Sequence, residues 1–247
     1  MDWRAFSVAW LGFALASAIA PTTPQKVRLP SVVLWAWERT EDLRFLKPGE
    51  AGVAFLARTI EVDRKALKVR SRRNPLHVPP GTPLVAVVRV ESRRLDSLTG
   101  KSEAMVATLR DLWHLPGVVG LQIDFDATRS QRSFYRDLLH RLQQTKPPGM
   151  TLTITALGSW CLGDPWIRDL PVDEAIPMLF QMGPDSLAVK DALARGGDFT
   201  VKLARSSVGY SVDEPFVPVP SGRRVYAFNP RAWTEGDFHA LKARLGR

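Results

Sequence analysis

Three side chains that can accept hydrogen bonds alternate along one short stretch of the chain: Gln122, Asp124 and Asp126. The apolar residues Ile123 and Phe125 lie between them. Because successive side chains of a strand point to opposite faces, the three acceptors share one face. Burying an unpartnered carboxylate is costly or shifts its pKa, so two of them on a buried strand indicate pairing, hydrogen bonding or function. Carboxylates placed in this way are suited to acid/base chemistry.

The residues that follow predict a strand–helix–strand unit. Residues 130–144 carry apolar side chains at helical spacing, and residues 150–157 form a second apolar strand. Such a unit implies a parallel sheet whose outer face is covered by helices. The acidic face must then point into a barrel lumen or into the cleft of an open sheet. An exposed antiparallel strand with one wet face is the alternative interpretation.

Eight segments are typical of strands, which favours a closed (β/α)8 barrel. They are residues 32–37, 52–61, 84–91, 118–126, 150–157, 175–181, 199–206 and 224–229. Helices are expected at residues 102–113, 130–144, 185–195 and 234–245. A hairpin around residues 63–65 follows the second strand, and an irregular loop rich in Gly and Pro follows the fifth. The sequence therefore predicts an α/β fold, a reduced (β/α)8 TIM-like barrel in which a hairpin and a loop replace some helices.

Residues 1–20 are typical of a signal peptide. Arg4 gives a basic start, residues 6–19 are nearly all apolar or small, and residues 16–18 read Ala-Ser-Ala, a small-x-small cleavage site. We expect cleavage after Ala18, export to the periplasm or the medium, and no stable membrane insertion afterwards. An uncleaved anchor is the alternative. Residues 28–247 are expected to form a single barrel domain.

The formal net charge of +9 comes from arginines scattered over several loops, and the sequence has no recognisable nucleic-acid-binding motif. Solvated loop charge is therefore favoured over nucleic-acid binding. The single Cys161 excludes an internal disulfide, and a buried, inert thiol is expected there. We expect no cofactor, and no metal because no histidine lies near Asp124 and Asp126 in the sequence.

In barrels of this type the active site forms at the carboxyl ends of the strands, and the polar and aromatic residues there are the candidates. Asp126 and Asp124 are the candidate catalytic residues. The candidate substrate-binding residues are Trp35, Trp37, Glu38, Arg89, Glu91, Trp160, Asp164, Gln181, Asp213 and Tyr226. Aromatic rings pack against pyranose C–H faces and carboxylates bind hydroxyls, so the set predicts a sugar site with Trp35, Trp37 and Trp160 near the two aspartates. Core tryptophans and an internal Arg89–Glu91 ion pair are the alternatives.

The segment from Gly120 to Asp126 resembles the fourth-strand motif of family-18 (chitinase-like) glycoside hydrolases, written DGxDxDxE. On that motif Gln122 stands in place of an Asp, Asp124 matches the Asp beside the acid, and Asp126 occupies the position of the catalytic Glu. Residues 176–181 resemble the sixth-strand Met-x-Tyr-Asp element, with Phe180 and Gln181 as departures. The resemblance implies Asp126 as general acid and an N-acetyl group of the substrate as nucleophile. Asp126 is one methylene shorter than the Glu of the motif.

A longer resemblance links the chain to a bacterial family known as domain of unknown function 3142. Residues 33–39, 123–128, 159–166 and 225–230 carry it. It implies a TIM-barrel family without an established activity. Two functions follow as hypotheses: an exported glycoside-hydrolase-like barrel acting on an envelope or environmental polysaccharide, N-acetylated sugars among the candidates, or a non-catalytic glycan-binding barrel of the cell envelope. In the enzyme, Glu38, Glu91 and Asp213 are the alternative partners of Asp126.

Overall fold

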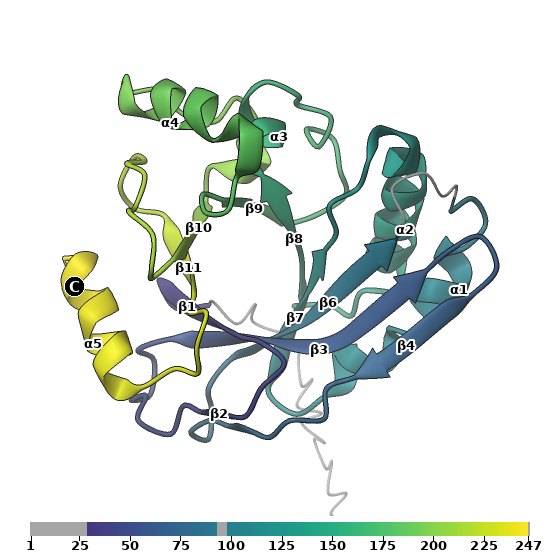
Figure 1. Cartoon of the computed structure of the whole chain (residues 1–247). Coiled ribbons are helices and arrows are strands. Elements are labelled where there is room, and N and C mark those ends of the chain that lie inside the picture. Colours follow the sequence, from purple (N-terminus) through teal and green to yellow (C-terminus); the bar gives the residue numbers. More distant parts are fainter. Residues whose placement is uncertain (1–28, 93–97, 247) are drawn as a thin grey trace, which may run out of the picture.

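The computed structural model describes residues 29–92 and 98–246, so the expected signal peptide lies outside the described residues. Eight parallel strands form a closed barrel, in the order β1, β11, β10, β9, β8, β7, β6 and β3, with β3 pairing back to β1 (Figure 1). The strands are β1 Val32–Ala36, β3 Gly52–Val62, β6 Leu84–Ser92, β7 Val118–Asp124, β8 Thr151–Leu157, β9 Glu174–Met178, β10 Ser207–Ser211 and β11 Arg224–Phe228. The predicted α/β barrel is confirmed.

Helices lie on the outside of this barrel (Figure 1). They are α1 Ser102–Ala107, α2 Arg132–Thr145, α3 Gly158–Leu162, α4 Ser186–Ala194 and α5 Glu235–Arg244. Helix α2 forms because Phe134, Leu138 and Leu142 recur every four residues and are buried against the barrel. None of the helices in the described ranges has the length and apolar character needed to cross a membrane.

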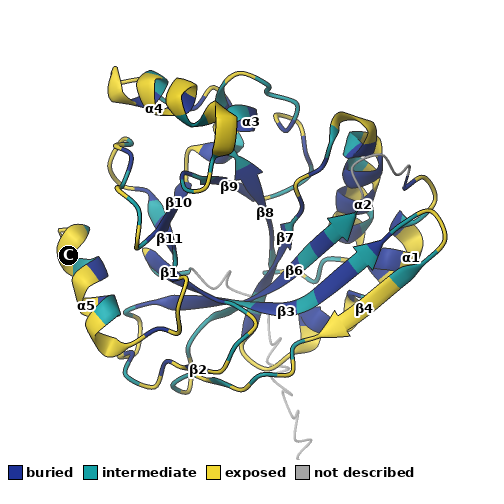
Figure 2. Cartoon of the chain, in the orientation of Figure 1, coloured by how far each residue is buried: buried dark blue, intermediate teal, exposed yellow. Residues whose placement is uncertain are grey.

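The barrel is reduced where the sequence predicted it. After β3 the chain turns back as β4 Leu67–Ser71, which pairs antiparallel with β3 and is largely exposed (Figure 2). After β8 comes the short helix α3 and then an irregular loop. Two further short strands, β2 Glu41–Asp42 and β5 Leu76–His77, pair with each other outside the barrel. The segment predicted as one helix over residues 102–113 divides into α1 and the 3₁₀ helix Arg110–His114.

The seventh strand was predicted in the wrong place, at residues 199–206. That segment is a loop with the 3₁₀ helix Lys202–Ala204, because the Thr200 hydroxyl donates to the carbonyl oxygens of Cys161 and Leu162 and ties the loop to α3. Phe199, Val201 and Ala204 are buried, which imitates the pattern of a strand. The strand itself, β10, has Ser, Gly and Ser at alternate positions, and only Val208 and Tyr210 are residue types favoured in strands.

The barrel lumen is filled by side chains and is closed below the carboxyl ends. Trp35 occupies it, and its ring packs against Tyr226 with centroids 5.4 Å apart. Gly209 of β10 makes room for this indole, since a Cβ there would lie 2.8 Å from the ring. Gln122 is fully buried beside Trp35 and accepts a 2.7 Å hydrogen bond from its indole N–H. The side chains that fill the lumen therefore form the floor beneath any ligand that binds at the carboxyl ends of the strands.

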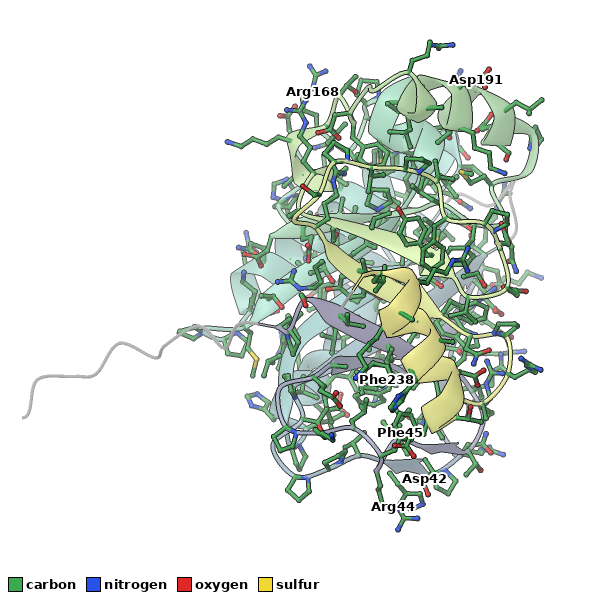
Figure 3. The ribbon with its side chains drawn as sticks, turned by 90° about the vertical axis from the view of Figure 1, so that its left-hand side faces the viewer. Asp42, Arg44, Phe45, Arg168, Asp191 and Phe238 are labelled. Atoms are coloured by element: carbon green, nitrogen blue, oxygen red, sulfur yellow. The ribbon has the colours of Figure 1, made fainter. Side chains whose placement is uncertain are left out.

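The C-terminal helix closes the outside of β1. Phe238 and Leu241 of α5 are buried there, and Phe238 packs against Phe45 with ring centroids 6.0 Å apart (Figure 3). The indole N–H of Trp233 donates to the carbonyl oxygen of Trp35 over 3.0 Å. These contacts link the end of the chain to the strand that carries Trp35.

Candidate functional site

A cavity of about 530 Å³ opens at the carboxyl ends of the barrel strands. Its volume falls within the range of small-molecule sites, roughly 300–1,000 Å³. The polar and charged side chains that line it include Arg89, Glu91, Asp124, Asp126, Thr155, Gln181 and Asp185, and the aromatic ones include Trp35, Trp37, Phe180 and Phe228. Seven of the twelve residues predicted for the site lie here: Trp35, Trp37, Arg89, Glu91, Asp124, Asp126 and Gln181.

Asp124 is the last residue of β7 and lies at the bottom of the cavity, half-buried. The hydroxyl of Thr155 on the neighbouring strand β8 donates a 2.7 Å hydrogen bond to its carboxylate. Burial raises the pKa of Asp124, the hydrogen bond from Thr155 opposes that rise, and the charge of Asp126 adds to it. Asp124 is thus a carboxyl group with a fixed position and a raised pKa.

Asp126 occupies a tight turn just beyond β7. The N–H of Ala127 donates to the carbonyl oxygen of Phe125 over 2.9 Å, and both flanking side chains are buried, which directs Asp126 outward. Phe125 is anchored by the ring of Tyr135, with centroids 5.2 Å apart. Asp126 is exposed to the cavity, but the cavity walls desolvate its carboxyl group in part; this raises its pKa, and Arg89 opposes that rise. Among the described residues none donates a hydrogen bond to the Asp126 carboxyl group, so it is available to a ligand.

Arg89 and Glu91 enter the cavity from the end of β6. The Arg89 Nε donates to Glu91 over 2.9 Å, so the ion pair given as the alternative interpretation exists, and both residues line the cavity. The guanidinium also lies over the Trp37 ring, 5.8 Å from its centroid. On its outer side Glu91 is 3.9 Å from Arg70, which pairs with Glu61 of β3. This chain of charges holds Arg89 beside the aromatic wall.

The aromatic wall of the cavity consists of side chains from three strand ends. Phe180 and Phe228 stack with centroids 5.7 Å apart and an interplanar angle of 8°, and the Trp37 ring meets Phe228 edge-on at 6.2 Å. Trp37 is partly exposed, whereas Trp35 is buried beneath it. Trp37 can therefore contact a ligand directly, while Trp35 supports the floor.

Gln181, at the cavity rim, has a left-handed backbone with φ of 49°. A non-glycine residue costs roughly 1–2 kcal/mol in this conformation. Its N–H donates to the Glu214 carboxylate over 3.1 Å, which holds the turn in place. Such strain is typical of functional sites, and Gln181 lines the cavity.

Five predicted substrate-binding residues lie outside the cavity: Glu38, Trp160, Asp164, Asp213 and Tyr226. Three of them are surface carboxylates with local partners. Glu38 accepts from the Asn74 amide over 2.9 Å, Asp164 pairs with Arg132, and Asp213 accepts from the Ser211 hydroxyl.

The two aromatic residues outside the cavity are part of the core. Trp160, expected beside the aspartates, is buried between the barrel and its helices and meets Trp166 edge-on at 5.0 Å. Helix α3 begins directly after β8 and carries this side chain away from the strand end. Tyr226 lies deep in the lumen, where its hydroxyl donates to buried Glu174 over 3.4 Å. Trp160 therefore belongs to the outer core, and Tyr226 supports the floor.

Several residues that line the cavity were not predicted from the sequence, among them Thr155 and Asp185. Thr155 had a usable signal, because it lies on the strand next to β7 and faces the lumen with Thr153. Asp185 comes from the 3₁₀ helix Gly183–Asp185 after β9 and had no periodic signal.

The cysteine and metal-ligand patterns give no further site. Cys161 is buried, and burial raises the pKa of its thiol to about 12, so it is a poor nucleophile. Within residues 29–92 and 98–246 no cluster of three or more His, Cys, Asp or Glu side chains has the arrangement of a metal site.

Eight parallel strands, a closed barrel and an acidic, aromatic-walled cavity at their carboxyl ends define a TIM-type barrel with a candidate active site in the usual position. Residues 80–176 match the model of a family described as Domain of unknown function (DUF3142), which confirms the resemblance predicted from the sequence. The matched segment runs from just before β6 into β9 and contains Arg89, Glu91, Asp124 and Asp126.

Comparison with curated proteins gave no match. Among solved structures, the chain is similar to the crystal structure of the Bacillus cereus spore cortex-lytic enzyme SleL, with 14% sequence identity and a TM-score of 0.49. The match covers 89% of this chain and 59% of the other, so the chain spans about three fifths of that structure.

Proposed function

We propose that the protein is a glycoside hydrolase that cleaves an envelope or environmental polysaccharide, with Asp126 as the general acid. The carrying observation is the Asp126 carboxyl group, which has a raised pKa, faces the cavity and has no hydrogen-bond donor among the described residues. A general acid must be protonated before it reacts and must reach the leaving oxygen; the raised pKa favours the first condition, and the position in the cavity supports the second.

Asp124 supports this chemistry from below. Its position is fixed by the hydroxyl of Thr155, which donates a hydrogen bond to its carboxylate. As an anion it stabilises the positive charge that develops on the sugar ring. Trp37 offers a ring face for the pyranose, and Gln181 offers an amide at the rim. Asp126 then donates its proton to the glycosidic oxygen as the bond from that oxygen to the sugar carbon breaks; water adds to this carbon and returns a proton to the Asp126 carboxylate.

The substitution Asp126→Asn tests this assignment. It removes the transferable proton at nearly constant volume, so hydrolysis of a polysaccharide substrate should fall on the order of 10²- to 10⁴-fold while the circular dichroism spectrum stays unchanged. Asp191→Asn is the matched control, because Asp191 is exposed on α4 and does not line the cavity. Hydrolysis that persists at the wild-type rate in Asp126→Asn would remove Asp126 from the mechanism.

A glycan-binding barrel without catalysis is the second candidate, and the short Asp126 in the position of a motif Glu favours it. Small misplacements of a reacting group can lower rates by large factors. In that case the wild type should bind oligosaccharides without cleaving them. Its affinity should fall more with Trp37→Ala than with Asp126→Asn, as isothermal titration calorimetry would show.

Export is part of the proposal. The basic start, the apolar run of residues 6–19 and the Ala16-Ser17-Ala18 site support it. A polysaccharide of the envelope or the environment would be encountered outside the cytoplasm, in agreement with that signal.

A further inference from the structure

Carboxylates outside the cavity are commonly neutralised by basic neighbours. Asp111 pairs with Arg58 over 2.8 Å, Asp173 with Lys146 over 2.7 Å, and Glu50 with Lys242 over 2.7 Å. This is the expected result in a chain with 34 basic and 25 acidic residues. Among the described residues, carboxylates without a basic neighbour also occur at the exposed surface, where water solvates them, as at Glu103 and Asp191.

The cavity brings several such carboxylates together at one place where a ligand can bind. Four carboxylates line it, Glu91, Asp124, Asp126 and Asp185, against a single basic residue, Arg89, among the described lining residues. Arg89 is already paired with Glu91. In the part of the chain that the structure describes, no Lys, Arg or His nitrogen lies within 4.0 Å of the other three carboxylates. Two of the four, Glu91 and Asp185, have no part in the proposed mechanism.

We propose that the ligand carries positive charge: an oligosaccharide with free amino groups, of the glucosamine type, in preference to its N-acetylated or anionic counterparts. This inference rests on the proposed function and names its substrate class. Ammonium groups would pair with the carboxylates that have no basic neighbour among the described residues, whereas a neutral sugar would bring no positive charge and an anionic sugar would be repelled. The partly exposed rings of Trp37, Phe180 and Phe228 also attract ammonium groups and receive the C–H faces of the sugar.

A binding comparison tests the preference directly. The full-length mature protein is titrated by calorimetry with glucosamine hexamer, N-acetylglucosamine hexamer and an oligogalacturonate, below the pKa of the amino groups. We expect the glucosamine hexamer to bind at least about ten-fold more tightly than the N-acetylated hexamer at about 0.01 M salt. The difference should shrink at about 1 M salt, where the Debye length falls to about 3 Å.

A variant pair locates the effect in the cavity. Asp185→Asn removes one lining carboxylate without removing a helix cap, because the Asp185 side chain makes no capping hydrogen bond. It should lower the preference for the glucosamine hexamer about two- to five-fold. Asp191→Asn makes the same change of charge on α4, at the outer edge of the molecule (Figure 3), and should leave the preference unchanged.

The outcomes separate this inference from the proposed function. If the N-acetylated hexamer is bound or cleaved and the glucosamine hexamer is not preferred, the inference is overturned and the hydrolase proposal stands. If Asp185→Asn and Asp191→Asn lower the preference equally, overall charge explains it and the inference also fails. If no hexamer is bound or cleaved, the proposed function fails together with the inference.

Discussion

Trp35 and Gln122 share a hydrogen bond in the barrel lumen, and their contributions to the free energy of unfolding should be strongly coupled. The indole N–H and the amide oxygen are 2.7 Å apart, and the two residues are 3% and 0% exposed. Trp35→Phe leaves the amide oxygen without this donor, and Gln122→Met leaves the indole N–H without an acceptor. Each unsatisfied buried group costs about 1–3 kcal/mol in addition to the change in packing.

The double variant removes both polar groups together. Its loss of unfolding free energy should therefore be smaller than the sum of the single losses by at least about 1 kcal/mol. Urea unfolding followed by far-ultraviolet circular dichroism measures all four free energies without relying on the substituted tryptophan. Additivity to within about 0.5 kcal/mol would refute the reasoning, since that is the behaviour of independent sites. Strong coupling would also explain why the neutral Gln122 stands where the family-18 motif has an Asp: an amide accepts a hydrogen bond from the indole N–H without burying a charge.

Three further predictions follow from the burial of single residues and from the first residues of the chain. Burial raises the pKa of Asp124 above its value in the unfolded chain, so ionisation of this group destabilises the fold as the pH rises through the unfolded and folded pKa values. Asp124→Asn should therefore stabilise the protein at neutral pH but not at pH about 3. Urea unfolding at the two pH values measures this. Trp160→Ala should lower the unfolding free energy by about 3–5 kcal/mol while the folded fraction retains wild-type affinity for oligosaccharides, measured by denaturation and calorimetry. Mass spectrometry of the exported protein should find Ile19 as the first residue, and an intact Met1 on a cytoplasmic protein would contradict the signal peptide.

The sequence predicted the barrel because most of its strands are continuous apolar runs, as in β1, β6 and β8. It also predicted the β3–β4 hairpin, whose register pairs Val62 with Leu67. It failed at β10, where Ser207, Gly209 and Ser211 have weak β-propensity. Gly209 is required there by the Trp35 ring across the lumen. Tertiary packing determines that composition, and no local pattern reveals it.

Of the candidate residues inside strands, all but Tyr226 line the cavity, whereas most of those beyond the strand ends do not. The alternation rule places Asp124 on the lumen face, and extending the strand by two residues still placed Asp126 in the cavity although β7 had ended. After β8, extending the strand pattern in the same way placed Trp160 wrongly. Helix α3 begins directly after β8, and in a helix the side-chain direction turns by about 100° per residue. Trp160 is therefore buried outside the barrel, whereas Asp185 reaches the cavity from a loop. The path of the loop determines where a residue beyond a strand end lies. The sequence placed Glu91 beside the two aspartates, but it gave no sign that Asp185 also lines the cavity.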